Sequence, residues 1–332
     1  MNPGAAVRGD LGEALRGLTC PLRFGERLAP YTSFRIGGPA GALALPRGEE
    51  DLLPLFARCR EEGLPLSLLG GGANLLVSDR GVRGVVVSFA EGFREVERVK
   101  WPPSEGSPSE PSEAPEGVLL RAGAGVKMPH LVALAAREGL AGLGCAAGVP
   151  GTVGGAVIMN AGSAESYLGQ VLHSVRWVAL PPAATEPREL GRGELRFTYR
   201  ATLFPAPGAV LAASFLLRRG DRKALQRALR EDSARRRRTQ PQGLPCAGSI
   251  FKNPPGGRAG VLIDRAGLKG LAVGRAAVSE THANFIVNRG GASAGEVLEL
   301  IAQIRRRVEE HSGVRLELEL RTLGEFEEGA LP

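Results

Sequence analysis

The sequence is poor in cysteine and contains no long hydrophobic run. Its four cysteines, at positions 20, 59, 145 and 246, are widely separated and form no Cys-x-x-Cys pair. This spacing matches neither a zinc site nor a disulfide framework, so we expect free thiols and no metal centre. No apolar run reaches the length of a bilayer span, and residues 1–10 lack the apolar segment of a signal peptide. These absences predict a cytoplasmic protein that is not attached to a membrane.

The remaining composition is that of a globular protein with a basic charge. The chain has 332 residues, of which 43% are hydrophobic and 23% are charged, which is enough for two or three compact units. The net charge of +7 suits polyanionic ligands, which include nucleic acids, dinucleotides and nucleotide sugars. Composition alone therefore leaves several ligand classes open.

A glycine-rich stretch between residues 144 and 162 is the most informative part of the sequence. Glycine lacks a Cβ atom, so backbone N–H groups in such a stretch can turn sharply and bind an anion. Interleaved valine, isoleucine and methionine residues argue against a merely mobile loop, and a turn within the core is the alternative. We expect this stretch to bind the phosphates of a cofactor through Gly148, Val149, Pro150, Gly151, Thr152, Gly154, Gly155 and Asn160.

A second glycine-rich loop follows an expected strand at residues 66–69. It matches neither Gly-x-Gly-x-x-Gly nor a P-loop, and three consecutive glycines are also common in ordinary loops. Together with the first loop it is a stronger signal, because a cofactor with two phosphates can lie between two such loops. The candidate residues here are Gly70, Gly71, Gly72, Ala73, Asn74 and Leu75.

The periodicity of the hydrophobic residues predicts a mixed α/β chain. Helices are expected over residues 49–62, 129–140 and 221–237, and from a capping box at residues 293–296 to about residue 313. Strands are expected over residues 66–69, 84–89, 94–101, 118–125, 175–180, 195–199, 210–217 and 314–320. Residues 102–117 are rich in Pro, Ser and Glu, so we expect a disordered loop that enlarges a hairpin.

Three further patches carry candidate catalytic side chains. Arg200 follows a strand and has the planar donor fork that binds carboxylates, although a single arginine there is more often a surface residue. Ser249 lies in a polar set of residues between prolines, and no Gly-x-Ser-x-Gly motif surrounds it, which disfavours a hydrolase. Glu319 lies beside Glu317 on the polar face of the expected last strand, where two exposed charges are the simpler interpretation.

A run of four arginines, Arg235–Arg238, stands near the end of an expected helix. Most such runs are solvated helix ends, where cations also interact favourably with the helix dipole. No aromatic residues for base stacking are interleaved with it. We therefore expect no nucleic-acid partner.

Two of these motifs together resemble one family of flavoenzymes. The sequences Gly-Val-Pro-Gly-Thr-Val-Gly-Gly-Ala-Val-Ile-Met-Asn-Ala-Gly at residues 148–162 and Ala-Gly-Ser-Ile-Phe-Lys-Asn-Pro at residues 247–254 are similar to those of the UDP-N-acetylenolpyruvoylglucosamine reductase family, which acts in peptidoglycan precursor synthesis. The ordered similarity runs from about residue 25 to residue 325. It includes residues 31–39, 69–79, 199–204, 266–288 and 316–324. No insertion with a substrate-capping tyrosine is evident, which is typical of the compact subtype.

The resemblance implies an α+β architecture, with an FAD-binding region of two subdomains followed by an α/β substrate domain. The implied limits are a lead-in at 1–24, subdomains at 25–92 and 93–220, a substrate domain at 221–326 and a tail at 327–332. Non-covalent FAD, NADPH as hydride donor and UDP-N-acetylenolpyruvoylglucosamine as substrate are implied. The oligomeric state is not.

The resemblance also implies a role for individual residues. Hydride passes from the reduced flavin to C3 of the enolpyruvyl group, Ser249 protonates C2, and Arg200 and Glu319 stabilise the enolic intermediate. The implied substrate contacts are Tyr199, Lys252, Asn253 and His282. Gly144, residues 163–166 and Arg275 depart from the family pattern. The alternative is an oxidase of the same cofactor class, but such enzymes often attach flavin through a histidine near the loop that corresponds to residues 70–75, and no histidine precedes His130.

Overall fold

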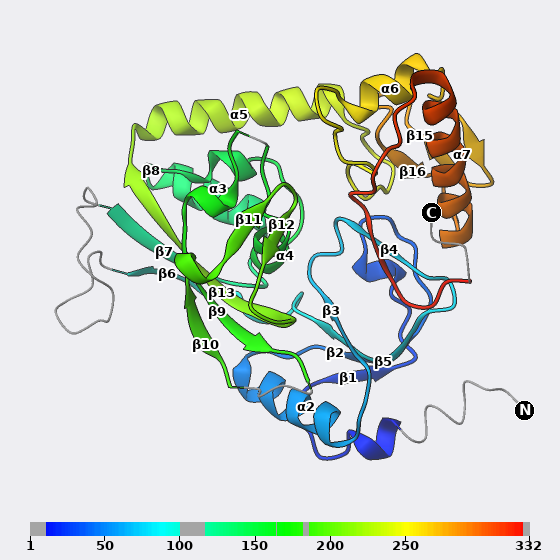
Figure 1. Ribbon diagram of the computed structural model, residues 1–332. Coiled ribbons are helices and arrows are strands. Elements are labelled where there is room, and N and C mark those ends of the chain that lie inside the picture. The colour runs from blue at the N-terminus through cyan, green and yellow to red at the C-terminus, as the bar shows by residue number, and fades with distance from the viewer. Residues whose placement is uncertain (1–10, 100–116, 164, 182–185, 328–332) are drawn as a thin grey trace, which may run out of the picture.

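The N-terminal part of the chain forms a four-stranded sheet (Figure 1). The structure, a computed structural model, describes residues 11–99, 117–163, 165–181 and 186–327. The sheet has the order β1-β2-β5-β3, built from β1 (Leu22–Phe24), β2 (Ala40–Ala44), β5 (Val82–Ser88) and β3 (Leu66–Leu69). Strand β5 is parallel to β2 and β3, and helix α2 (Glu49–Glu61) connects those two strands. Leu52, Leu55, Phe56 and Cys59 are buried at the spacing of one face of that helix, as the sequence predicted.

A second, antiparallel sheet follows. Its order is β10 (Arg188–Gly191), β9 (Leu172–Ala179), β13 (Gly208–Arg219), β7 (Gly117–Gly123) and β6 (Val96–Val99), and β8 (Leu140–Ala141) pairs with the end of β13. Strand β13 is almost wholly buried because helix α4 (Val153–Ile158) packs on it. Strands β6 and β7 are antiparallel neighbours, which confirms the expected hairpin. Apart from Gly117, the loop at 102–117 lies outside the described residues.

A separate hairpin joins β11 (Arg196–Thr198) to β12 (Ala201–Leu203) through a turn made of Tyr199 and Arg200. Arg200 has a φ of +62°, in the left-handed region that side chains with a Cβ rarely adopt. The sequence predicted a strand here but not the hairpin. Short 3₁₀ turns occur at η1 (Ala29–Tyr31), η2 (Leu143–Ala146), η3 (Leu168–Gln170) and η4 (Arg192–Glu194).

The two long helices of the C-terminal part are α5 (Arg222–Thr239) and α7 (Ala294–Ser312). Helix α3 (Met128–Arg137) lies against the start of α5 (Arg222–Thr239), and α5 extends from the second sheet across to the C-terminal elements (Figure 1). Asp221 caps α5 by accepting a hydrogen bond from Lys223 N at 2.9 Å. Helix α7 (Ala294–Ser312) begins at the expected capping box and ends at Gly313. Its buried stripe lies in one core with α6 (Ala259–Arg265), β15 (Ala276–Val278) and β16 (Ile286–Asn288), while β14 (Ala272–Val273) pairs with β15.

The C-terminal segment returns to the N-terminal part of the molecule. Strand β17 (Arg321–Leu323) is parallel to β4 (Leu75–Val77), so this segment is paired with residues at the end of the glycine loop 70–75. The expected strand at 314–320 is wrong. Within it, Leu318 makes only an isolated bridge to Phe251, because this extended segment lacks a continuous neighbouring strand. An alternation of buried and exposed residues shows that successive side chains point to opposite sides of an extended segment. It does not require that segment to pair with a neighbouring strand.

Candidate active site

The two glycine-rich loops lie against each other backbone to backbone. A Cβ atom placed on Gly71 would be 2.6 Å from Gly151 Cα, and one placed on Gly70 would be 3.1 Å from Thr152 Oγ1. Gly151 itself has a φ of +96°, which glycine adopts without strain. The two loops that the sequence singled out therefore lie side by side, and their closeness depends on residues without side chains.

Thr152 supplies the observation that tests whether a phosphate-bearing cofactor fits here. It occupies the N-cap position of α4, but its side chain makes no capping hydrogen bond. Its Oγ1 is buried and has no hydrogen-bond partner among the described residues. A buried hydroxyl without a partner is unfavourable unless a ligand completes it. The glycine loops and this hydroxyl fit the pyrophosphate of a dinucleotide such as FAD.

Asn160 and Asn74, also expected at the cofactor, have side chains engaged with the protein. Asn160 Oδ1 accepts a hydrogen bond from Gly169 N at 3.0 Å, and its Nδ2 donates to Thr198 O at 2.9 Å. Asn74 Nδ2 donates to Glu319 O at 2.9 Å. These two side chains therefore connect the glycine loops to the Arg200 hairpin and to Glu319.

An ion pair joins Arg200 to Glu319, with 2.8 Å between Arg200 Nε and Glu319 Oε1. Arg200 Nη1 also donates to Gly162 O, and its guanidinium lies 5.1 Å from the ring centre of Tyr199. The Nε–H group is not directed well enough at the carboxylate to form a hydrogen bond and has no other acceptor among the described residues. Tyr199, an expected substrate contact, is itself exposed.

Glu319 is largely buried, with only 12% of its side chain exposed, whereas Glu317 is 76% exposed. The interpretation of both as exposed charges was therefore wrong for Glu319. Burial raises the pKa of Glu319, and the attraction of Arg200 opposes this without cancelling it. The alternating pattern placed both glutamates on one polar face, and it carried no information about the hairpin that covers Glu319.

Backbone hydrogen bonds hold the residue after Ser249 beside Glu319. Glu319 N donates to Ile250 O at 2.8 Å, and Lys252 N donates to Glu317 O at 2.8 Å. Ser249 is half-buried and follows Gly248, which has a φ of +73°. Segments from two distant parts of the sequence thus bring the region of Ser249 together with Glu319 and, through the ion pair, with Arg200.

The other expected substrate contacts divide into two groups. Asn253 Oδ1 accepts a hydrogen bond from Ala259 N at 3.1 Å at the start of α6, and a Cβ placed on Gly260 would be 3.1 Å from His282 Cε1. These two side chains therefore flank the same helix start. Burial lowers the pKa of His282, which favours its neutral form. Lys252 lies apart in an exposed ion pair with Glu317, with 3.3 Å between Nζ and Oε2.

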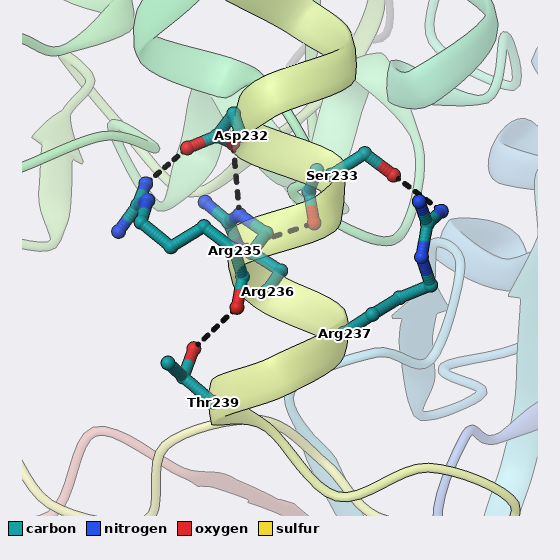
Figure 2. Close-up of polar contacts among 7 residues, drawn as sticks. Asp232, Ser233, Arg235, Arg236, Arg237 and Thr239 are labelled. Carbon is teal, nitrogen blue, oxygen red and sulfur yellow. Dashed lines mark hydrogen bonds and ion pairs between the residues drawn. The ribbon is translucent and has the colours of Figure 1, made fainter.

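The run of arginines ends helix α5, as expected, and much of its hydrogen bonding stays within the helix (Figure 2). Arg235 and Arg236 pair with Asp232, and Arg237 Nη1 donates to Ser233 Oγ at 3.0 Å. Arg236 also reaches the first glycine-rich stretch, where its Nη1 donates to Gly148 O at 3.2 Å. The sequence did not predict this contact between the helix and the cofactor loop.

Comparison with known proteins agrees with this geometry. Residues 240–323 match the model of the UDP-N-acetylenolpyruvoylglucosamine reductase C-terminal domain, and residues 40–181 match that of an FAD-binding domain. A reductase of that name from Heliobacterium modesticaldum is 42% identical over 302 residues, covering 90% of each chain. The chain belongs to the UDP-N-acetylenolpyruvoylglucosamine reductase family.

Two further members of this family support the assignment. A relative from Desulfosudis oleivorans is 42% identical and covers 92% of this chain and 95% of its own. The crystal structure of the reductase from Thermus caldophilus has a TM-score of 0.72 and 36% identity, covering 92% of this chain and 98% of that one. The resemblance, the α+β architecture and the FAD-dependent oxidoreductase class predicted from the sequence are confirmed. Within the described residues, no helix is long and apolar enough to cross a membrane.

Proposed function

We propose that this chain reduces the enolpyruvyl group of UDP-N-acetylenolpyruvoylglucosamine to give UDP-N-acetylmuramate, with NADPH as hydride donor. Arg200, Ser249 and Glu319 are the proposed catalytic residues. The observation that carries the proposal is the largely buried Arg200–Glu319 ion pair, hydrogen-bonded through Glu319 N to the residue that follows Ser249. Arg200 is thus connected to the segment of Ser249 through Glu319, and a carboxylate-bearing alkene would need both a cation for its carboxylate and a proton donor.

The glycine loops at 70–75 and 148–155 would hold FAD, with Thr152 Oγ1 and backbone N–H groups as donors to its pyrophosphate. When bound there, FAD supplies a two-electron carrier between NADPH and C3 of the enolpyruvyl group. We propose that it is bound non-covalently, because the first histidine in the chain is His130, well after the glycine loop 70–75.

Arg200 and Glu319 act on the charge that the reaction creates. When hydride adds to C3, the carbon–carbon π bond breaks and its electron pair moves to C2 and the adjacent carboxylate. A guanidinium already fixed near that carboxylate stabilises the added charge more strongly than it stabilises the ground state. Glu319 holds the guanidinium in place, and the turn between β11 and β12 presents it.

Ser249 completes the reaction by donating its hydroxyl proton to C2. A hydroxyl is a weak acid in water, but it can protonate a strongly basic carbanion from within hydrogen-bonding distance. The backbone hydrogen bonds of Ile250 restrict where Ser249 can lie relative to Glu319. Tyr199, Lys252, Asn253 and His282 are the proposed contacts to the nucleotide sugar.

The experiment that tests this proposal measures the two half-reactions separately. Ser249→Ala should leave reduction of the flavin by NADPH nearly unchanged, because that step needs no proton at the sugar. Reoxidation of the flavin by UDP-N-acetylenolpyruvoylglucosamine should slow by roughly a hundred- to ten-thousandfold, and Ser249→Cys should recover part of the rate. Ser174→Ala, which removes a hydroxyl hydrogen bond to Glu189 in the second sheet, should change neither half-reaction. Equal slowing of both half-reactions by Ser249→Ala would refute the assigned role.

The remaining expectations from the sequence stay predictions. We propose that the reaction takes place in the cytoplasm and that nucleic acids are not partners. The division into domains at residues 25–92, 93–220 and 221–326 is likewise a proposal. Phe34 and Leu76, from the first of these, lie in the same core as helix α7, so any such division crosses a shared core.

A further inference from the structure

Asn284 is a buried polar residue that the proposed chemistry does not use. It lies in the loop between β15 and β16 and is only 4% exposed. Its side-chain amide makes two hydrogen bonds to one residue of the Ser249 loop. Oδ1 accepts from Phe251 N at 3.0 Å, and Nδ2 donates to Phe251 O at 2.8 Å.

The backbone of Asn284 extends the same pairing. Its carbonyl oxygen accepts a hydrogen bond from Ile250 N at 2.9 Å. The residues before Ser249 pair with β16 of the same hairpin, because Asn288 N donates to Pro245 O at 2.9 Å. At Asn284 the chain turns away into the hairpin loop, so a neighbouring strand cannot continue the pairing. The side-chain amide takes the place of the missing backbone groups.

The opposite edge of the segment 250–252 is held by the residues around Glu319. Glu319 N and Leu320 N both donate to Ile250 O, at 2.8 and 3.2 Å. The backbone groups of Ile250 and Phe251 are therefore satisfied from two sides, by Asn284 on one and by the Glu319 segment on the other. Asn284 N also donates to His282 Nδ1 at 3.2 Å, which connects an expected substrate contact to the same network.

We infer that Asn284 is a positioning residue, whose side chain sets the register of the Ser249 loop against Glu319. This inference rests on the proposed role of Ser249 as the proton donor. A buried amide can satisfy its hydrogen bonds in many places in a core, but here both side-chain bonds go to Phe251, two residues after Ser249, and the backbone carbonyl binds Ile250, the residue next to Ser249. Misplacing a reacting group by about 1 Å can cost about a hundredfold in rate.

The test compares two matched asparagines. Asn288 is also buried, at 2% exposure, and its Nδ2 donates to Phe34 O at 3.0 Å while its Oδ1 accepts from Gly290 N and Ala292 N. Asn284→Asp and Asn288→Asp each keep the accepted hydrogen bonds and lose one donated to a buried carbonyl. Asn284→Ala and Asn288→Ala provide a second pair without a buried charge.

In FAD-loaded protein, the Asn284 variants should slow flavin reoxidation by the enolpyruvyl substrate about thirty- to hundredfold and leave reduction by NADPH within about threefold. The Asn288 variants should lower Tm to a similar extent but change neither half-reaction. Hydrogen exchange at the amides of Ile250 and Phe251 should accelerate in the Asn284 variants alone, a readout that needs no turnover.

Two outcomes would overturn the inference. One is equal slowing of both half-reactions by Asn284→Ala, and the other is an equal loss of reoxidation rate in the Asn288 variants at matched Tm. Failure of the proposed function is recognised separately, because Ser249→Ala would then slow both half-reactions equally whatever the Asn284 variants do.

Discussion

The close contact between the two glycine loops makes Gly71→Ala the sharpest steric test of the cofactor site. The substitution adds a single methyl group at a residue whose φ is not positive, so alanine brings no backbone strain of its own. That methyl carbon would lie 2.6 Å from Gly151 Cα, 3.0 Å from Gly151 C and 3.1 Å from Thr152 N. All three atoms belong to the backbone, so no side chain can rotate to relieve the contact.

The size of the effect follows from these distances. Carbon atoms in good contact are about 3.5 Å apart or more, so the loops must separate by roughly 0.9 Å. Overpacking of this kind costs about 1–3 kcal/mol. Because the two loops are the proposed pyrophosphate cradle, we expect the cost to appear in FAD binding. It corresponds to a dissociation constant for FAD that is about five- to 150-fold higher.

The assay is titration of FAD into apo-protein, followed by flavin fluorescence, with Tm of the apo-protein measured in parallel. Gly144→Ala is the matched control, because a Cβ at Gly144 meets nothing within 4 Å although the residue lies just before the same loop. FAD affinity should be unchanged in that variant. An FAD dissociation constant for Gly71→Ala within twofold of the wild-type value would refute the reasoning, as would equal weakening by the control.

Two other predictions follow from charges in the structure. Burial raises the pKa of Glu319, and its ionised form pairs with Arg200. We therefore expect kcat/KM to fall on the acid side with a midpoint shifted upward from that of an ordinary glutamate. Glu319→Gln should lower kcat/KM and abolish the fall of kcat/KM at acid pH. The exposed control Glu317→Gln should keep that fall. An unchanged pH profile in Glu319→Gln would exclude Glu319 as the titrating group. Replacing Arg235, Arg237 and Arg238 together by Gln should leave NADPH-dependent turnover within about threefold, since these side chains lie on the helix surface. Sub-micromolar RNA or DNA binding at physiological salt that those substitutions abolish would contradict the expectation of no nucleic-acid partner.

Local patterns in the sequence predicted local structure well. The capping box at Ser293 opens helix α7, and Asp221 caps α5, because both signals act within a few residues of the helix start. The glycine loops were recognisable for a similar reason, since glycine at close backbone contacts has few substitutes. The prediction of a strand at 314–320 was wrong because the alternation of residues indicates only which side chains are buried. Whether a segment pairs depends on whether another strand lies beside it.

Contacts between distant segments could not be derived from patterns. Arg200 and Glu319 are far apart in the sequence, and only the resemblance to a known family indicated a common role for them. Asn284 left a weaker signal, a single amide between alanine and an apolar Phe-Ile-Val run. Buried polar groups are almost always hydrogen-bonded, so that asparagine implied a partner without identifying it. Arg236 gave no signal that separated it from the neighbouring arginines.

In the proposed role, Arg200 would offer its charge to a substrate although it is already paired, and its geometry is consistent with this. A left-handed φ in a residue with a Cβ costs about 1–2 kcal/mol, and the hairpin turn holds Arg200 there while Gly162 O and Glu319 hold its side chain. Glu319 balances the charge of the guanidinium, which lowers the cost of keeping that charge out of water. Arg200 Nε lies 2.8 Å from Glu319 Oε1, so the guanidinium is fixed in place before a substrate binds. A donor held in this way needs no reorganisation when negative charge develops beside it, and this is the condition under which electrostatic stabilisation of a transition state is most effective.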